Sequence, residues 1–204
     1  MPSDHLSGVS SSDLPASPPL RMLVVCTANV CRSPVAERLL QRHLDQREVS
    51  ARVRSAGTHG GHNVVHRDTV RAAADVEVDL GDHVSRPLSR ELLDSDGADL
   101  VITMTREHLR HAIGINPDVW PRTFTLKEVV RRASAFDAVD ASIDLPTWRL
   151  AVADGRTAAS MMRDDPDDDV LDPYGGPSAG HAAMVAEVSA LTDALARHVA
   201  AALR

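Results

Sequence analysis

Along most of this chain, short strand-like runs alternate with stretches in which apolar residues recur at helical spacing. Four runs have the length of a single buried strand, at residues 22–25, 49–55, 98–104 and 122–126. Six stretches have a helical pattern, at residues 35–46, 66–76, 88–93, 106–113, 127–133 and 179–203. Strands that alternate with helices predict an α/β fold, here a small doubly wound sheet of four parallel strands with helices on both faces.

Length and composition indicate one folded domain. The first twenty residues are rich in Ser, Pro and Asp, so we expect residues 1–20 to be a disordered tail and residues 21–204 a single domain. A net charge of −7 disfavours nucleic acid as a partner, and no run approaches the ~20 apolar residues of a membrane span. Two cysteines make no disulfide framework, which favours a reducing, cytoplasmic location. No feature of the sequence specifies an oligomeric state.

The residues that follow the first strand carry the clearest chemical signal. The strand ends at Cys26, Arg32 and Ser33 follow shortly after, and Pro34 suits the first turn of a helix. A strand, a tight loop and a helix N-terminus place backbone N–H groups around a phosphate-sized anion and stabilise a thiolate. The planar guanidinium of Arg32 can hold two phosphoryl oxygens at once. Together these residues predict phosphoryl transfer through a covalent cysteine.

This loop resembles that of the low-molecular-weight protein tyrosine phosphatases, whose signature is C-x-x-x-x-x-R-S with Asn at the fourth position. The residues that fit the signature are Cys26, Asn29, Arg32 and Ser33, and Cys31 matches a second cysteine found in many members. The resemblance continues through residues 55–58, 79–88, 98–109 and 172–175.

The resemblance implies a role for each residue of the loop. Cys26 is the expected nucleophile, which forms a phosphocysteine intermediate, and Arg32 stabilises the charge of the transition state. Ser33 donates a hydrogen bond to the sulfur of Cys26. The expected phosphate-binding loop consists of Thr27, Ala28, Asn29, Val30, Cys31 and Ser33.

Asn29 is expected to hold the loop in its shape, because asparagine tolerates left-handed φ and bonds to nearby backbone. The resemblance implies that Ser55 and His83 support it. Ala28 stands where members of the family usually carry glycine, and it strains the loop by about 1 kcal/mol or more if that position needs a positive φ. For Cys31 two readings stay open, a reversible disulfide with Cys26 that shields the nucleophile, and simple packing.

Asp172, in the sequence Asp-Pro-Tyr-Gly, matches the general acid of the family. The same carboxylate can protonate a leaving oxygen and then activate water against the phosphocysteine. Tyr174 is expected to form one wall of a phosphotyrosine slot. In many members an aromatic residue after the second strand forms the other wall. Here the matching stretch begins at His59 and has no Phe, Tyr or Trp, but the flat rings of its histidines can substitute. A small aryl phosphate or a small phosphorylated metabolite also fits, and the mechanism needs no metal or other cofactor.

Residues 135–169 resemble an insertion before the acid loop, expected to form a helical flap over the pocket. Its apolar residues Trp148, Leu150 and Val152 are expected to pack, whereas the run of aspartates at 164–169 is expected to be too charged for burial.

Two other functions remain open at this level. The first is an arsenate reductase, which shares this loop and needs a small external thiol because residues 32–204 hold no cysteine. The second is a non-catalytic phosphate-binding module, which Ala28 and the missing aromatic wall favour. The intact set of Cys26, Arg32 and Asp172 favours the phosphatase over both.

Overall fold

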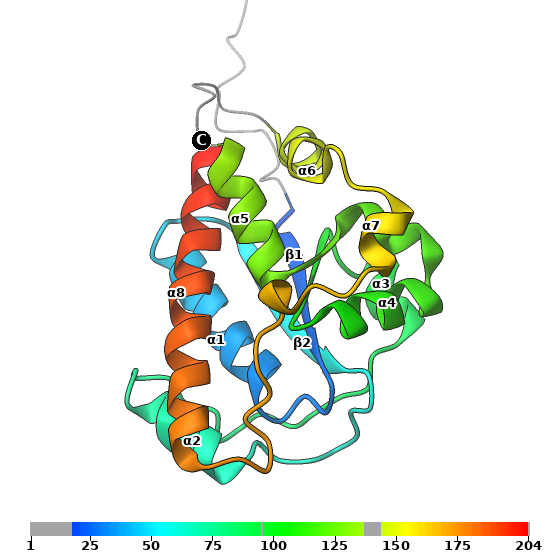
Figure 1. Ribbon diagram of the computed structural model, residues 1–204. Helices are drawn as coiled ribbons and strands as arrows, with labels where there is room; N and C mark the ends of the chain where they lie inside the picture. Colours follow the sequence, from blue (N-terminus) through cyan, green and yellow to red (C-terminus); the bar gives the residue numbers. More distant parts are fainter. Residues whose placement is uncertain (1–17, 95, 137–143, 204) are drawn as a thin grey trace, which may run out of the picture.

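In the computed structural model, which describes residues 18–94, 96–136 and 144–203, the centre of the fold is a parallel sheet (Figure 1). Its four strands are β1 (Leu20–Cys26), β2 (Ala51–Gly57), β3 (Leu100–Thr103) and β4 (Thr123–Thr125). They lie in the order β2-β1-β3-β4, and every neighbouring pair is parallel. The predicted sheet of four parallel strands is therefore confirmed.

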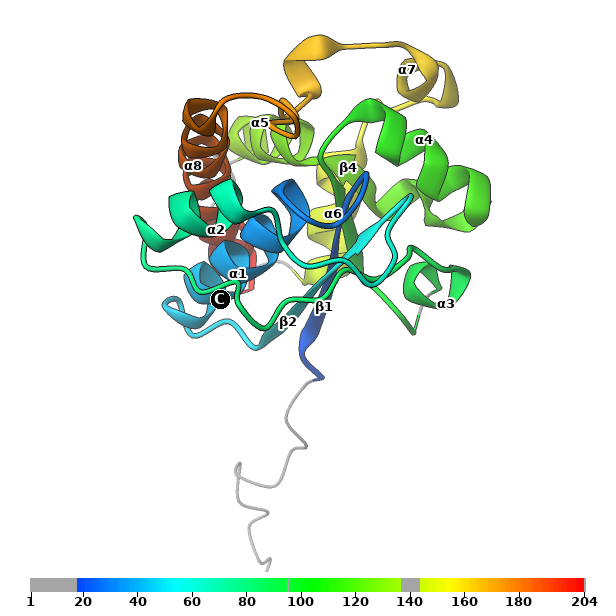
Figure 2. The same cartoon turned by 90° about the horizontal axis from the view of Figure 1, so that it is seen from below.

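Helices cover both faces of the sheet, as Figure 2 shows with the sheet between two groups of helices. One group consists of α1 (Arg32–Asp45), α2 (Arg67–Ala74), α5 (Leu126–Phe136) and α8 (Ser178–Ala202). The other consists of α3 (Arg90–Leu93), α4 (Arg106–Ile115) and the 3₁₀ helix η1 (Pro117–Arg122). The fold is therefore doubly wound, as expected.

The two-residue period of β1 divides its side chains between two cores. Met22, Val24 and Cys26 belong to the larger core, which α1 and α8 share, whereas Leu23 and Val25 belong to the core under α4. A strand buried on both faces needs a continuous apolar run, and this is the pattern that the sequence has. The same period turns the side chain of Cys26 toward the α1 side.

The sheet also fixes where a ligand can bind. The chain moves outward from β1 in both directions, to β2 on one side and to β3 and β4 on the other. Ligands of such sheets bind beyond the carboxyl ends of the strands, where the two directions part. Cys26, the last residue of β1, lies at this point.

The segment 135–169 contains α6 (Leu145–Ala153), α7 (Ala158–Met162) and the 3₁₀ helix η2 (Pro166–Asp168); residues 137–143 lie outside the described residues. Figure 1 shows α6 near the start of β1 and the end of α8, at the opposite end of the sheet from the carboxyl end of β1. In this position α6 does not cover the pocket as a flap. Trp148 and Val152 are buried, but Leu150 is 72% exposed. Trp148 and Val152 are four residues apart and share the buried face of α6, whereas Leu150 lies on the opposite, exposed face.

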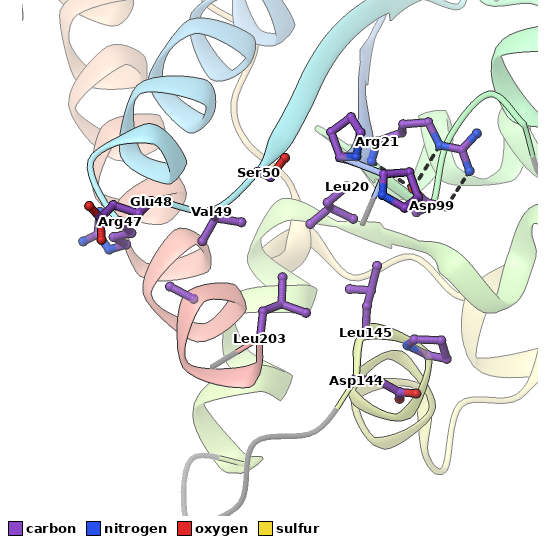
Figure 3. A pocket seen from close by; sticks show the side chains of 14 residues that line it. Leu20, Arg21, Arg47, Glu48, Val49, Ser50, Asp99, Asp144, Leu145 and Leu203 are labelled. Carbon is purple, nitrogen blue, oxygen red and sulfur yellow. Dashed lines mark hydrogen bonds and ion pairs between the residues drawn. The ribbon is translucent and has the colours of Figure 1, made fainter. Parts of the chain in front are cut away.

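A cavity of about 670 Å³ lies at this same end of the sheet (Figure 3). Leu20, Leu145 and Leu203 line it, and Arg21 and Asp99 form an ion pair of 2.8 Å at its rim. It is larger than the cavity at Cys26, but the described residues that line it include no cysteine.

The aspartate run at 164–169 corrects a second expectation. Asp168 is completely buried, because its carboxylate accepts hydrogen bonds from Arg106 and Arg131. From the sequence, the negative charge of this run was expected to prevent burial. At Asp168 two guanidinium groups compensate that charge.

Of the predicted tail at residues 1–20, residues 1–17 lie outside the described residues, whereas Leu20 already belongs to β1. None of the helices in the described parts of the chain has the length and apolar character needed to cross a membrane.

Candidate active site

The loop between β1 and α1 bends sharply at Asn29, which has a φ of 56°. This is the left-handed region that asparagine tolerates better than most residues. The loop backbone also packs closely on the end of β2: a Cβ atom on Gly57 would lie 2.7 Å from the carbonyl oxygen of Thr27. Gly57 therefore lets β2 approach the loop. Ala28 is not among the residues with positive φ, so the strain considered for it does not arise.

The side-chain amide of Asn29 uses all of its hydrogen-bonding capacity. Its Nδ2 donates to Ser33 Oγ and to Ser55 Oγ, each at 2.8 Å. Its Oδ1 accepts from the backbone N–H of Arg86 at 3.0 Å and lies 3.2 Å from His83 Nε2. Burial lowers the pKa of His83, so the ring is neutral at pH 7, with Nε2 as the donor. Ser55 and His83 thus lie where the family resemblance implied, around Asn29.

Ser33 Oγ lies 3.0 Å from the sulfur of Cys26. Because Asn29 already donates to this oxygen, the hydroxyl proton of Ser33 is available to the sulfur. The Ser33 hydroxyl is therefore placed to donate a hydrogen bond to the predicted nucleophile. Cys26 also lies beside the N-terminus of α1, whose dipole favours a negative charge.

Arg32 is buried, and its guanidinium contacts three groups. Nη1 donates to the carbonyl oxygen of Val170 at 3.2 Å, and Nη2 donates to Thr27 Oγ1 at 3.1 Å and to Asp172 Oδ2 at 2.5 Å. Nε is buried and has no hydrogen-bond partner among the described residues. Such a donor is costly unless it finds an acceptor, and an anion in the loop supplies one.

A cavity of about 280 Å³ opens at the loop. It is lined by Cys26, Ala28, Val30 and Arg32 from the loop region and by Asp172 and Tyr174 from the segment before α8. The structure thus brings together the predicted nucleophile, the predicted cation and the predicted acid, although Asp172 is 140 residues from Arg32 in the sequence. Tyr174 is mostly exposed at the mouth.

His59 is not among the residues that line this cavity. Its backbone N–H donates to the carbonyl oxygen of Thr27 at 2.8 Å, and its ring lies 5.9 Å from that of His111. A different histidine lies beside Tyr174: the ring of His66 meets it edge-on at 5.6 Å. His66 also binds the loop, because its backbone N–H donates to the carbonyl oxygen of Val30 at 2.9 Å.

The structure adds two site residues that the sequence patterns did not indicate. One is Val170, whose carbonyl oxygen holds Arg32. The other is His108, whose Nε2 lies 2.9 Å from Thr27 Oγ1. Thr27 follows β1 and His108 follows β3. These strands are neighbours in the sheet, so a correct prediction of the strand order would have indicated that the two residues lie close together.

Cys31 is a buried free thiol, and burial is the main cause that raises its pKa to about 11. It is therefore protonated at neutral pH, unlike a nucleophile.

One group of possible metal ligands consists of His66, Asp68 and His181, whose ligand atoms lie within 4.8 Å of one another. The two rings are stacked with only 11° between their planes. Lone pairs in nearly parallel planes do not converge on one ion, so this arrangement does not favour metal binding.

Comparison with known proteins identifies the family. The model of the low molecular weight phosphotyrosine protein phosphatase family matches residues 21–141. The low molecular weight protein-tyrosine-phosphatase Etp of Escherichia coli K12 is 39% identical over 106 residues, which are 50% of this chain and 66% of that protein. The match thus spans slightly less than two thirds of Etp. The protein-arginine-phosphatase of Bacillus subtilis is 35% identical over 127 residues, 61% of this chain and 83% of that protein.

Among solved structures, a mutant of YwlE from Bacillus subtilis superposes with a TM-score of 0.66 at 29% identity, over 88% of this chain and 98% of that one. The low molecular weight protein tyrosine phosphatase of T. tengcongensis superposes with a TM-score of 0.63 at 27% identity, over 86% and 97%. Since the family model covers more than half of the chain, this protein belongs to the low molecular weight phosphotyrosine protein phosphatase family.

Proposed function

We propose that this protein is a metal-independent protein-tyrosine phosphatase that works through a phosphocysteine intermediate. The observation that carries the proposal is the cavity of about 280 Å³ in which Cys26, Arg32 and Asp172 meet. A thiolate, a guanidinium and a carboxyl group at one anion-binding loop are the parts that phosphoryl transfer through cysteine requires.

In the first step the thiolate of Cys26 attacks the phosphorus of the substrate and forms an S–P bond as the P–O bond to the tyrosine oxygen breaks. Asp172 gives its proton to that oxygen, so the product leaves as a neutral phenol. Arg32 stabilises the charge on the transferred group with Nε and Nη2. Since Nη2 contacts Asp172 in this structure, the phosphoryl oxygens compete with the carboxylate for the guanidinium.

In the second step a water molecule attacks the phosphocysteine, and the S–P bond breaks to release inorganic phosphate. Asp172, now ionised, takes a proton from that water. Ser33, which lies 3.0 Å from the sulfur, stabilises the departing thiolate with a hydrogen bond. Every group in this cycle belongs to the chain, the substrate or water.

The cavity favours an aryl phosphate as substrate. Its apolar lining includes Ala28 and Val30, and Tyr174 offers an aromatic ring, all of which suit the ring of a phosphotyrosine. Phosphoarginine is the second candidate, because the similar Bacillus subtilis protein is named a protein-arginine-phosphatase. Among the described residues that line the cavity, Asp172 is the only carboxylate. The guanidinium of a phosphoarginine substrate would therefore have one ionic partner in the cavity.

The experiment is hydrolysis of p-nitrophenyl phosphate in the presence of EDTA. Cys26→Ser should abolish activity, and Asp172→Asn should lower kcat by roughly 10²-fold to 10⁴-fold. Asp167→Asn is the matched control, because this exposed carboxylate lies in the same segment outside the cavity. Activity that survives Cys26→Ser or disappears with EDTA would refute the proposal. Peptides of one sequence with phosphotyrosine or phosphoarginine then decide the substrate by their kcat/KM.

The same assay addresses the two alternatives. A folded wild type without phosphatase activity that reduces arsenate with an external thiol would be a reductase. Binding of inorganic phosphate without either reaction would indicate a phosphate-binding module. We further propose a cytoplasmic location, which the two free thiols of Cys26 and Cys31 support, since reducing compartments preserve thiols.

A further inference from the structure

His108 lies in the first turn of α4, directly beyond the carboxyl end of β3, and its side chain is buried. The ring has a hydrogen-bond partner at each nitrogen: Nδ1 lies 2.9 Å from Thr105 Oγ1, and Nε2 lies 2.9 Å from Thr27 Oγ1. Two contacts in the ring plane fix the orientation of an imidazole. His108 is therefore a rigid group beside the phosphate-binding loop.

Thr27 connects this ring to the guanidinium of Arg32. Its Oγ1 accepts a hydrogen bond from Arg32 Nη2 at 3.1 Å while it contacts His108 Nε2. A threonine side chain on a loop can rotate about χ1, and the contact with His108 selects the rotamer that faces Arg32. Nη2 is also the nitrogen that contacts Asp172, so its direction bears on both the phosphoryl group and the acid.

The ring of His108 stays uncharged at any pH at which a thiolate enzyme works. Burial, together with the positive charge of Arg32 and the neighbouring rings of His111 and His59, lowers the pKa of His108 to about 3. A neutral ring adds no repulsion to a guanidinium that must bind an anion. It also excludes His108 itself as a proton donor at neutral pH.

We propose that His108 is a positioning residue, which holds the hydroxyl of Thr27 and thereby orients Arg32 Nη2 toward the transferred phosphoryl group. This inference rests on the proposed function. A loss of orientation affects the transition state more than ground-state binding, so kcat falls while KM changes little.

The test compares His108→Phe, which removes both hydrogen bonds, with His108→Gln, whose amide N–H can still reach Thr27. Hydrolysis of p-nitrophenyl phosphate should fall roughly 10-fold to 100-fold in kcat for His108→Phe and less than about 5-fold for His108→Gln. Glu107→Gln is the control on the exposed side of α4 and should keep the activity of the wild type. Equal losses in the Phe and Gln variants would assign the effect to packing and overturn the proposal.

A double-mutant cycle with Thr27→Val tests the route of the effect. If His108 acts through Thr27, the double variant is no slower than the slower single variant; losses that multiply would overturn the proposal. The affinity for orthovanadate, which resembles the transition state when bound to a thiolate, should weaken in His108→Phe by a similar factor. Because vanadate binding needs no turnover, an unchanged affinity overturns the role of His108, whereas an inactive wild type refutes only the proposed function.

Discussion

Replacement of Asp168 by asparagine removes one negative charge from a buried cluster of ionic groups. The carboxylate is fully buried and accepts from Arg106 Nε at 3.0 Å and from Arg106 Nη2 at 2.5 Å, with Arg131 as a third donor. The side chain of Arg106 is 10% exposed, whereas that of Arg131 is 54% exposed. In the variant Arg131 can turn to water, but the guanidinium of Arg106 remains buried without its ion-pair partner.

The expected loss of stability follows from this asymmetry. Removal of one partner of a buried ion pair lowers the free energy of unfolding by about 3 to 5 kcal/mol, and one stranded guanidinium places Asp168→Asn near the lower value. The control is Asp164→Asn in the same run of aspartates. Asp164 is 84% exposed where it pairs with Arg110. An exposed pair of this kind contributes less than about 1 kcal/mol.

Urea denaturation of the two variants measures the difference. With an m-value of about 3 kcal/mol/M, Asp168→Asn should move the midpoint down by about 1 M, and Asp164→Asn by less than about 0.3 M. Both changes remove the same charge from the same segment, so net charge cannot explain a difference. Equal midpoints for the two variants would refute the assignment of Asp168 as a structural anion.

Three further changes test other parts of the structure. Gly57→Ala brings a Cβ atom within 2.7 Å of the Thr27 carbonyl oxygen and should lower kcat/KM for p-nitrophenyl phosphate by about 100-fold. Asn29→Ala places alanine at a φ of 56° and removes the bonds to Ser33 and Ser55, so thermal denaturation should show at least about 2 kcal/mol of lost stability. For pH, the pKa of His108 is about 3 in the folded protein and 6.5 in the unfolded chain. The unfolded chain therefore binds the proton first, and stability falls by about 2 kcal/mol between pH 7 and pH 5. His108→Gln should lack this part of the decline, and identical pH profiles would contradict a buried neutral ring.

The parts of the fold that local patterns determine could be predicted from the sequence. The strand that ends at Cys26 is recognisable as an apolar run. The loop after it combines a cysteine, an arginine and a helix N-terminus, a combination that indicates binding and transfer of a phosphoryl group. Each of the predicted strands and helices overlaps an observed one, because the period of apolar residues is a local property. The loop and the proposed acid were both indicated by motif, since Asp172 is recognisable by its neighbours Pro173 and Tyr174.

Contacts between distant segments account for what the sequence did not show. Asp168 is buried because Arg106 and Arg131 reach it from 62 and 37 residues away, and no rule about charged runs includes such partners. His108 belongs to the site because β1 and β3 are neighbours in the sheet, and periodicity predicts strands but not their order. The error at Leu150 has a local cause, because Trp148 and Val152 define the buried face of α6 and Leu150 lies opposite.

The contacts of Arg32 give a reason why binding and catalysis depend on each other at this site. Nη1 donates to the carbonyl oxygen of Val170, two residues before the proposed acid Asp172, and Nη2 donates to both Thr27 and Asp172. A phosphoryl group supplies an acceptor for Nε and competes only for the contact with Asp172, so the other two contacts can keep the guanidinium in place. In the proposed mechanism, the carboxyl group that this exchange releases is the one that gives a proton to the leaving group. Arginine alone has enough donors in one plane for these tasks, so lysine at position 32 would lose the exchange as well as the bidentate grip.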